Sequence, residues 1–251
     1  MKILLSFLAS AAFAATASAA TPLQPTFRIE NFNAPLVIDN PWWPMLPGTR
    51  TVHHGLEDGE CQVTEVAVTD GAKRNFTGAF AGLAARVVID RVWRDPRCDG
   101  KRGLLLEDTR DWYGQDNGGN VWYFGETTVE YEYNDAGHRI GSSTQGSWEA
   151  GRNGAKAGIV MFRRPVVGTY YRQEYFAGEA EDEATILRVG IRLATPLGRF
   201  HDCLKTREAT PLEPGIFEYK YYCANLGVVR VEAPSVHGGA TLVLSGVEGV
   251  R

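Results

Sequence analysis

In the sequence DWYGQDNGGNVWYFGE, residues 111–126, two aromatic-rich segments flank a run of Gly, Asn and Asp. Asn, Asp and Gly tolerate the positive φ angles that tight turns require, so a turn is predicted over Gly114–Gly119. The flanking segments are rich in the residues that strands prefer. Together they predict an antiparallel hairpin with the arms Leu104–Tyr113 and Asn120–Glu132.

The pairing of this hairpin decides which acidic side chains meet. If Tyr113 lies opposite Asn120, strand alternation places Glu107 opposite Glu126 on one face of the sheet. Like charges that face each other destabilise a sheet. A pair of glutamates would therefore need a shared proton, a bound cation or a nearby arginine.

A slip of one residue on the first strand changes the composition of this face. Asp108 then replaces Glu107, and Arg110 and Trp112 join the same face. A carboxylate stays close to Glu126 in either register, and the sequence leaves both registers open.

Aromatic and charged side chains alternate in other predicted strands as well. The stretch GSWEAG, residues 146–151, is expected to lie beside Trp122 and Tyr123, while YYRQEY (170–175) and EYKYY (218–222) repeat the alternation. Such faces suit a polar, ring-shaped ligand such as a sugar, because aromatic rings stack and charged groups bind hydroxyls. The candidate ligand-binding residues are Asp108, Arg110, Asp111, Trp112, Trp122, Tyr123, Trp148, Glu149, Arg172, Glu174 and Lys220, and the candidate catalytic carboxylates are Glu107 and Glu126.

The same residues also fit an ordinary sheet without any site. A Trp or Tyr on one face of a strand makes common core, and exposed charges on the other face are solvated pairs that contribute little stability. Core packing is the competing interpretation for Trp122, Phe124 and Tyr131.

Turn residues bound a long series of β-rich segments and leave no room for repeated crossover helices. The predicted strands are 62–68, 84–93, 103–113, 120–133, 138–149, 169–175, 185–194, 200–208, 216–223, 227–232 and 240–245. The single helix candidate is the acidic run 178–184. We expect a mainly β fold with a single curved antiparallel sheet, a half-closed barrel, and the alternative is a two-sheet sandwich. Residues 21–251 are expected to form one domain with an extended, Pro-rich lead-in over residues 21–48.

The N-terminus predicts export. A basic start, a short apolar run and the small residues up to Ala20 are typical of a secretory signal peptide, residues 1–20. The run is too short and too rich in alanine for a membrane anchor. The mature chain is therefore expected in the periplasm or secreted, without a stable membrane anchor.

Four cysteines in an exported chain predict two disulfides. Cys203 and Cys223 lie symmetrically about the turn sequence PLEPG, so a hairpin there would place them on opposite strands at disulfide distance. Cys61 and Cys98 would then form the second bond, worth about 3 to 4 kcal/mol on the loop-entropy model. No C-x-x-C spacing favours zinc.

Charge and motifs argue against several classes of function. The net charge of −4 does not provide the basic surface that nucleic acid would require. His53 and His54 are adjacent and would point to opposite faces of a strand, so no metal site is predicted. There is no G-x-S-x-G motif for a nucleophilic serine, and no cofactor is expected. The expected partner is a small-molecule, lipid or glycan ligand.

The motifs DWYGQD, GNVWYFGE and GSWEAG, in this order, resemble an exported bacterial family without an established function, over roughly residues 40–232. RFHDCLKT followed by EYKYYCANLGVVRVE is similar to the closing strands of envelope proteins with LolA/LolB-like curved sheets. The second resemblance implies a concave sheet face that holds a lipophilic ligand. This chain departs from an apolar lipid carrier because Arg, Glu and Lys occur on its candidate face.

Two functions are therefore open. The first is an exported binding or carrier protein that holds a small or polymeric ligand on an aromatic and charged sheet face. The second is an enzyme that acts on a glycan or similar polar substrate through paired carboxylates, one of which needs a raised pKa.

Overall fold

The computed structural model describes residues 20–57, 59–234 and 239–249. The predicted signal peptide, apart from Ala20, lies outside the described residues. Within the described ranges, no helix has the length and apolar character of a membrane-spanning segment.

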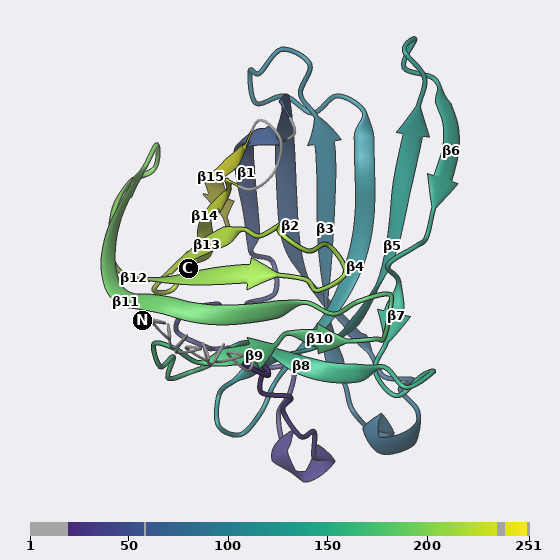
Figure 1. Cartoon of the computed structure of the whole chain (residues 1–251), viewed down its shortest axis with the longest axis vertical. Helices are drawn as coiled ribbons and strands as arrows, with labels where there is room; N and C mark the ends of the chain where they lie inside the picture. Colours follow the sequence, from purple (N-terminus) through teal and green to yellow (C-terminus); the bar gives the residue numbers. More distant parts are fainter. Residues whose placement is uncertain (1–19, 58, 235–238, 250–251) are drawn as a thin grey trace, which may run out of the picture.

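One antiparallel sheet dominates the described part of the chain (Figure 1). Thirteen strands follow one another in the order β10-β8-β5-β4-β3-β2-β1-β15-β14-β13-β12-β11-β9, and β6 and β7 pair with β5. Their bounds are β1 Arg50–Glu57, β2 Glu60–Lys73, β3 Ala85–Arg94, β4 Leu105–Gln115, β5 Val121–Tyr133, β6 Arg139–Ser143, β7 Trp148–Glu149, β8 Lys156–Met161, β9 Tyr170–Arg172, β10 Glu174–Tyr175, β11 Glu183–Thr195, β12 Gly198–Ala209, β13 Tyr219–Cys223, β14 Gly227–Ala233 and β15 Ala240–Glu248. Two short 3-10 helices, Ile29–Asn31 and Gly78–Phe80, complete the elements.

The predicted fold class is confirmed: the sheet curls into a nearly closed barrel. Its two end strands, β9 and β10, are consecutive parts of one segment and are separated only by Gln173. The first part pairs with β11 and the second with β8, so the chain itself bridges the seam between the ends of the sheet. Gly158 of β8 permits this close approach, because a Cβ there would lie 2.3 Å from the carbonyl carbon of Gln173.

The hairpin β4–β5 forms as predicted, but its register differs from both sequence-based alternatives. Gln115 pairs with Val121, and Asp111 pairs with Glu126. The pairing shifts between Asp111 and Tyr113, where Gly125 provides an additional residue at a φ of 122°. The sequence-based pairing of Glu107 with Glu126 is therefore wrong.

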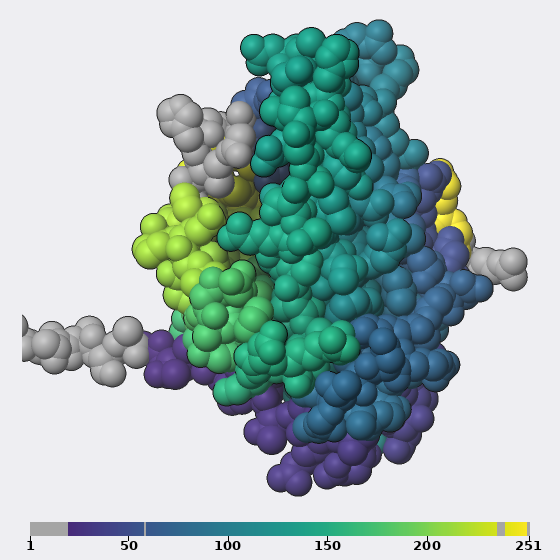
Figure 2. Space-filling view, turned by 90° about the vertical axis from the view of Figure 1, so that its right-hand side faces the viewer, coloured from purple at the N-terminus to yellow at the C-terminus, as the bar shows by residue number. Residues whose placement is uncertain are grey.

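The chain before β1 packs across the outer face of β4–β5 and one end of the barrel. At the bottom of Figure 1 and of Figure 2, it forms the purple part of the molecule. Phe27 stacks on Phe80, and Phe32 contacts Trp122 edge to face. Asn40 then donates from Nδ2 to the carbonyl of Gly119 at 2.8 Å, which ties this segment to the β4–β5 turn.

Both predicted disulfides form. Cys203 pairs with Cys223 across β12 and β13, which are opposite each other in the sheet. Cys61 of β2 is bonded to Cys98 in the loop after β3. Disulfides form and persist in oxidising compartments, so the protein belongs to the periplasm or the exterior of the cell.

Other expectations for individual elements need correction. The acidic run 178–184 contains no helix; Phe176 and Ala180 form a β-bridge there, and β11 begins at Glu183. The predicted strand 138–149 is divided into β6 and β7 by a turn. Strands β1 and β8 were not predicted, because their Gly, His and Lys residues weaken the apolar alternation.

Candidate functional site

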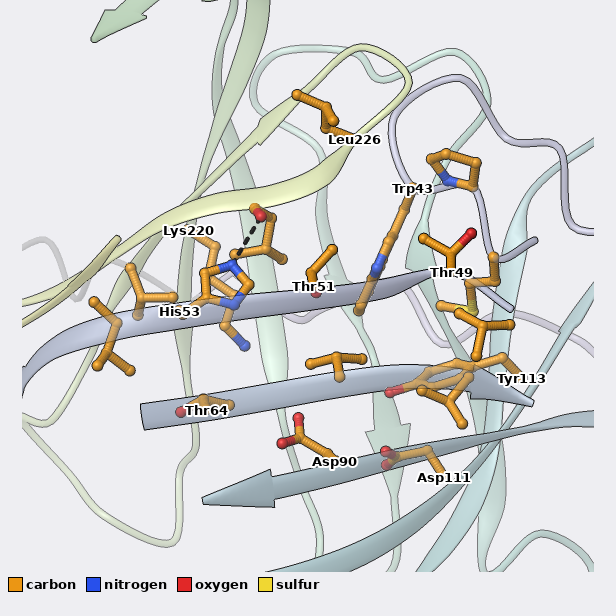
Figure 3. Close-up of a pocket in the computed structure, with 18 residues that line it drawn as sticks. Trp43, Thr49, Thr51, His53, Thr64, Asp90, Asp111, Tyr113, Lys220 and Leu226 are labelled. Carbon is orange, nitrogen blue, oxygen red and sulfur yellow. Dashed lines mark hydrogen bonds between the residues drawn. The ribbon is translucent and has the colours of Figure 1, made fainter. Parts of the chain in front are cut away.

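The interior of the barrel contains two adjoining compartments. One has a volume of about 220 Å³ and the other of about 230 Å³, and Trp43, Tyr113 and Lys220 line both of them. Figure 3 shows the first compartment, with Asp90 and Asp111 pointing into it from neighbouring strands. The interior of the sheet, and not its outer surface, is therefore the candidate site.

The first compartment is mainly apolar. Side chains of β1 to β4 and of β13 to β15 line it together with the segment before β1. Its apolar lining residues are Trp43, Pro44, Met45, Val66, Val68, Val88, Leu226, Val228, Val231 and Leu242. His53 also lies in this lining, where Nε2 is 2.9 Å from the carbonyl oxygen of Val228 (Figure 3). Burial lowers the pKa of His53, so this side chain stays neutral.

The second compartment combines aromatic rings with acids. Its walls include Trp43, Tyr113, Tyr123 and Tyr222 together with Glu126, Glu174, Asp182 and Glu208. The rings of Tyr113 and Tyr123 are stacked with centroids 4.8 Å apart. Trp43 contacts both Tyr113 and Tyr222, with centroid distances of 5.7 and 5.4 Å. Gly227 makes room for this indole, because a Cβ there would lie 2.8 Å from its Cδ1.

The bulge in β5 brings two acids and a tyrosine together. Tyr123 and Glu126 are three residues apart and would face opposite sides of a regular strand. With the additional residue Gly125 between them, both side chains face the interior. The hydroxyl oxygen of Tyr123 then lies 2.7 Å from Oδ1 of Asp111 and 2.6 Å from Oε2 of Glu126.

This geometry requires a proton on one of the two carboxyl groups. A phenol has a single hydrogen, so Tyr123 can donate to only one of its two acidic neighbours. The other short contact is a hydrogen bond only if that carboxyl group is protonated and donates to the phenolic oxygen. Burial raises the pKa of both Asp111 and Glu126. Repulsion by Asp90 and Glu107 raises the pKa of Asp111 further, whereas hydrogen bonds with Tyr123 and Glu126 lower it. Repulsion by Asp111 raises the pKa of Glu126.

Asp90 of β3 lies beside this pair. Burial and the nearby Glu107 raise the pKa of Asp90 to about 7. Its Oδ1 atom is buried and has no hydrogen-bond partner within the described residues. Glu107 itself points to the same side of the sheet, where it accepts a hydrogen bond from Thr109 at 2.6 Å.

Lys220 of β13 forms a separate group with two glutamates. Its ammonium lies 3.0 Å from Oε2 of Glu208 and 2.9 Å from Oε1 of Glu218. Thr206 and Tyr222 also donate to Glu208, at 2.7 and 3.0 Å. Although burial alone would raise it, the pKa of Glu208 is lowered by Lys220 and these hydrogen bonds, so this carboxylate stays ionised.

Some of the predicted ligand-binding and catalytic residues line the compartments. Asp111, Tyr123, Glu126, Glu174 and Lys220 line them. Trp148 is buried directly behind, with its ring 5.4 Å from that of Tyr123 in an edge-to-face contact.

The other predicted residues lie away from both compartments. Asp108 and the exposed Arg110 are on the outer face of β4, and Trp112 contacts Phe76 on that side. Trp122 donates to Asp116 at 2.8 Å. Glu149 pairs with Lys73, and Arg172 pairs with Glu183. Core packing, the competing interpretation, is confirmed for Trp122 and Phe124.

Sequence reasoning missed Asp90, Trp43 and Tyr113. The stretch VVIDRVW carries one signal, because strand alternation puts Asp90 on the same face as Val88, a typical core residue. Nothing local indicates that Trp43, from the segment before β1, reaches the barrel interior.

Within residues 20–57, 59–234 and 239–249, no group of three or more His, Cys, Asp or Glu side chains could hold a metal ion. His53 and His54 lie on opposite faces of β1, and His54 pairs with Asp95 at 3.0 Å outside the compartments.

Two solved structures resemble the chain. An exported protein with a YmcC-like fold, as it is described, from Bacteroides fragilis has a TM-score of 0.39 and 14% identity over 83% of this chain and 99% of its own. A protein described as a lipoprotein from Parabacteroides distasonis has a TM-score of 0.38 and 12% identity over 82% and 98%. No family model and no curated protein matches the sequence. Scores this low contribute nothing to the assignment of function, and both sequence resemblances stay predictions.

Proposed function

We propose that this protein is an extracytoplasmic binding or carrier protein that holds one small amphipathic molecule inside its barrel. The observation that carries the proposal is the pair of adjoining compartments, one mainly apolar and one acidic and aromatic. Ligand sites are typically concave and mostly apolar, with a few convergent polar groups that fix orientation. An apolar body beside a polar head group is the ligand shape that matches this division.

The acids at the site support binding better than catalysis. Glycoside hydrolases separate their two carboxyl groups by roughly 5 to 9.5 Å, with the sugar between them. Here Asp111 and Glu126 both contact the single hydroxyl oxygen of Tyr123. That hydroxyl occupies the space in which a glycosidic bond would have to lie.

A second candidate function is a carboxylate-dependent enzyme acting on a polar substrate. It is favoured by the raised pKa of Glu126, which would allow this side chain to act as a general acid near neutral pH. Glu126→Gln would then abolish turnover of a substrate while the fold persists, whereas a pure binding protein has no turnover to lose.

A larger side chain inside the apolar compartment should compete with a ligand for the same space. Val231 lines this compartment, so Val231→Phe adds volume inside it. We expect the variant to bind an alkyl-chain probe such as octyl glucoside at least about tenfold more weakly, because a chain and the new ring compete for one space. Thermal shift and native mass spectrometry of the purified protein measure the loss.

Val189→Phe is the matched control. Val189 is 43% exposed on the β11–β12 hairpin and does not line either compartment. It should bind the probe as the wild type does. Equal binding by wild type and Val231→Phe would place the ligand elsewhere and contradict the proposal.

A further inference from the structure

The first compartment contains an acid with a buried oxygen that has no hydrogen-bond partner among the described residues. Oδ1 of Asp90 is buried, and no donor of the described residues reaches it. Buried polar atoms in native proteins are almost always hydrogen-bonded. Since Asp90 points into the compartment (Figure 3), a ligand that fills the space can provide the missing donor.

Acidic groups outnumber basic ones around this point. The charged groups that act on the cluster of Asp90, Asp111 and Glu126 include Glu107 of β4, Glu174 of β10 and Lys220 of β13. Tyr113 and Tyr123 also face it, and burial raises the pKa of both phenols well above 10. Lys220 is the one Lys or Arg among the described residues that line either compartment, and it is already paired with Glu208 and Glu218.

Aromatic rings complete the surroundings. Trp43, Tyr113 and Tyr123 line the acidic compartment. Cations are attracted to the faces of such rings, and the attraction grows when water is excluded. Carboxyl groups and aromatic rings at one end of an apolar cavity are the chemistry that recognises an organic ammonium group.

We infer that the ligand is an amphipathic amine whose protonated amino group lies among Asp90, Asp111 and Glu126 and whose hydrocarbon part occupies the apolar compartment. The inference rests on the proposed binding function and adds the chemical class of the head group. An ammonium group has N–H donors that can bind the unpartnered Oδ1 atom of Asp90. A carboxylate head group would instead be repelled by Asp90.

Binding of an amine should change the number of protons that the carboxyl cluster carries. Without ligand, the cluster holds protons near neutral pH, because its members are buried and repel one another. An ammonium group favours the ionised carboxylates, so the cluster releases protons as the amine binds. We expect about one proton per amine at pH 7.

The test compares four probes with the same chain: octylamine, octyl glucoside, octanol and octanoate. Titration calorimetry at pH 7, in phosphate and in Tris, measures both affinity and proton release. Octylamine should bind at least about tenfold more tightly than the other three, and only its apparent enthalpy should depend on the buffer. Asp90→Asn should remove most of this preference without weakening octyl glucoside.

Asp108→Asn is the matched control, because Asp108 lies on the outer face of β4. It should keep the preference for octylamine. If Asp90→Asn does not fold, the buffer dependence of the octylamine binding enthalpy of the wild type still tests whether the amine displaces protons from the cluster. Binding of octyl glucoside, octanol or octanoate as tight as that of octylamine would overturn the amine inference and leave the carrier function intact. Binding of none of the four would contradict both.

Discussion

At the scale of single residues, one hydroxyl group organises the site. Tyr123 lies within hydrogen-bond distance of two carboxyl groups that pair directly across β4 and β5. Two ionised carboxylates at that position would repel each other in a buried space. A shared proton resolves the repulsion, and it links the stability of the fold to pH.

The sign of this link follows from the raised pKa values. Burial and repulsion by Asp111 raise the pKa of Glu126 to about 8, whereas an unfolded Glu titrates near 4.3. Between these values the folded state binds more protons than the unfolded state. The free energy of unfolding therefore decreases as the pH rises through this range.

Glu126→Gln should flatten this pH dependence, because glutamine cannot ionise. We expect the variant to exceed the wild type in stability by on the order of 2 kcal/mol at pH 9 and to differ little at pH 5. Urea unfolding at both values measures the difference. Glu130→Gln, an exposed position on the same strand, is the control and should follow the wild type. A parallel decline of Glu126→Gln and wild type would show that Glu126 is ionised without penalty.

At the scale of elements, the bulge in β5 decides which side chains face the interior. Gly125 has a φ of 122°, and a Cβ there would lie 2.3 Å from the carbonyl oxygen of Trp148. Only glycine adopts this backbone conformation without strain, and only glycine fits beside β7. The single additional residue places Glu126 on the same face as Tyr123.

Gly125→Ala should therefore destabilise the fold by about 3 kcal/mol, combining a backbone penalty with a steric clash. Gly154→Ala is the matched control, since Gly154 also has a positive φ, 86°, but nothing within 4 Å of the added Cβ. It should cost only about 1 kcal/mol. Thermal unfolding compares the two variants. Equal losses of stability would mean that the close contact with β7 does not contribute to the cost of Gly125→Ala.

At the scale of the whole molecule, the segment before β1 completes the site. Asn40 is fully buried; its Nδ2 donates to Gly119, and its Oδ1 accepts from the backbone N–H groups of Trp42 and Trp43. One side chain thus connects the β4–β5 turn to the indole that lines both compartments. The position of Trp43 depends on contacts between residues 79 positions apart.

Asn40→Ala should release this segment, because three hydrogen bonds to a buried side chain are lost. We expect a loss of about 2 to 3 kcal/mol in stability and faster amide exchange at Trp42, Trp43 and Gly119. Hydrogen exchange followed by mass spectrometry locates the effect. Asn33→Ala, at an exposed position in the same segment, should leave exchange at Trp43 unchanged. Unchanged exchange in Asn40→Ala would contradict the anchoring role.

Features that depend on short-range chemistry could be predicted from the sequence. Strand alternation and turn residues predicted most of the sheet, the hairpin around residues 114–119 and the Cys203–Cys223 disulfide, because these follow from neighbours along one or two strands. The Cys61–Cys98 disulfide followed by elimination. The pairing of Asp111 with Glu126, the approach of Asp90 and the insertion of Trp43 depend on the folded arrangement of distant segments. A bulge of one residue reverses which face a side chain occupies, and closure of the barrel turns that face into the wall of a cavity. The bulge leaves one local signal, the glycine at position 125 within the strand, and closure of the barrel leaves none.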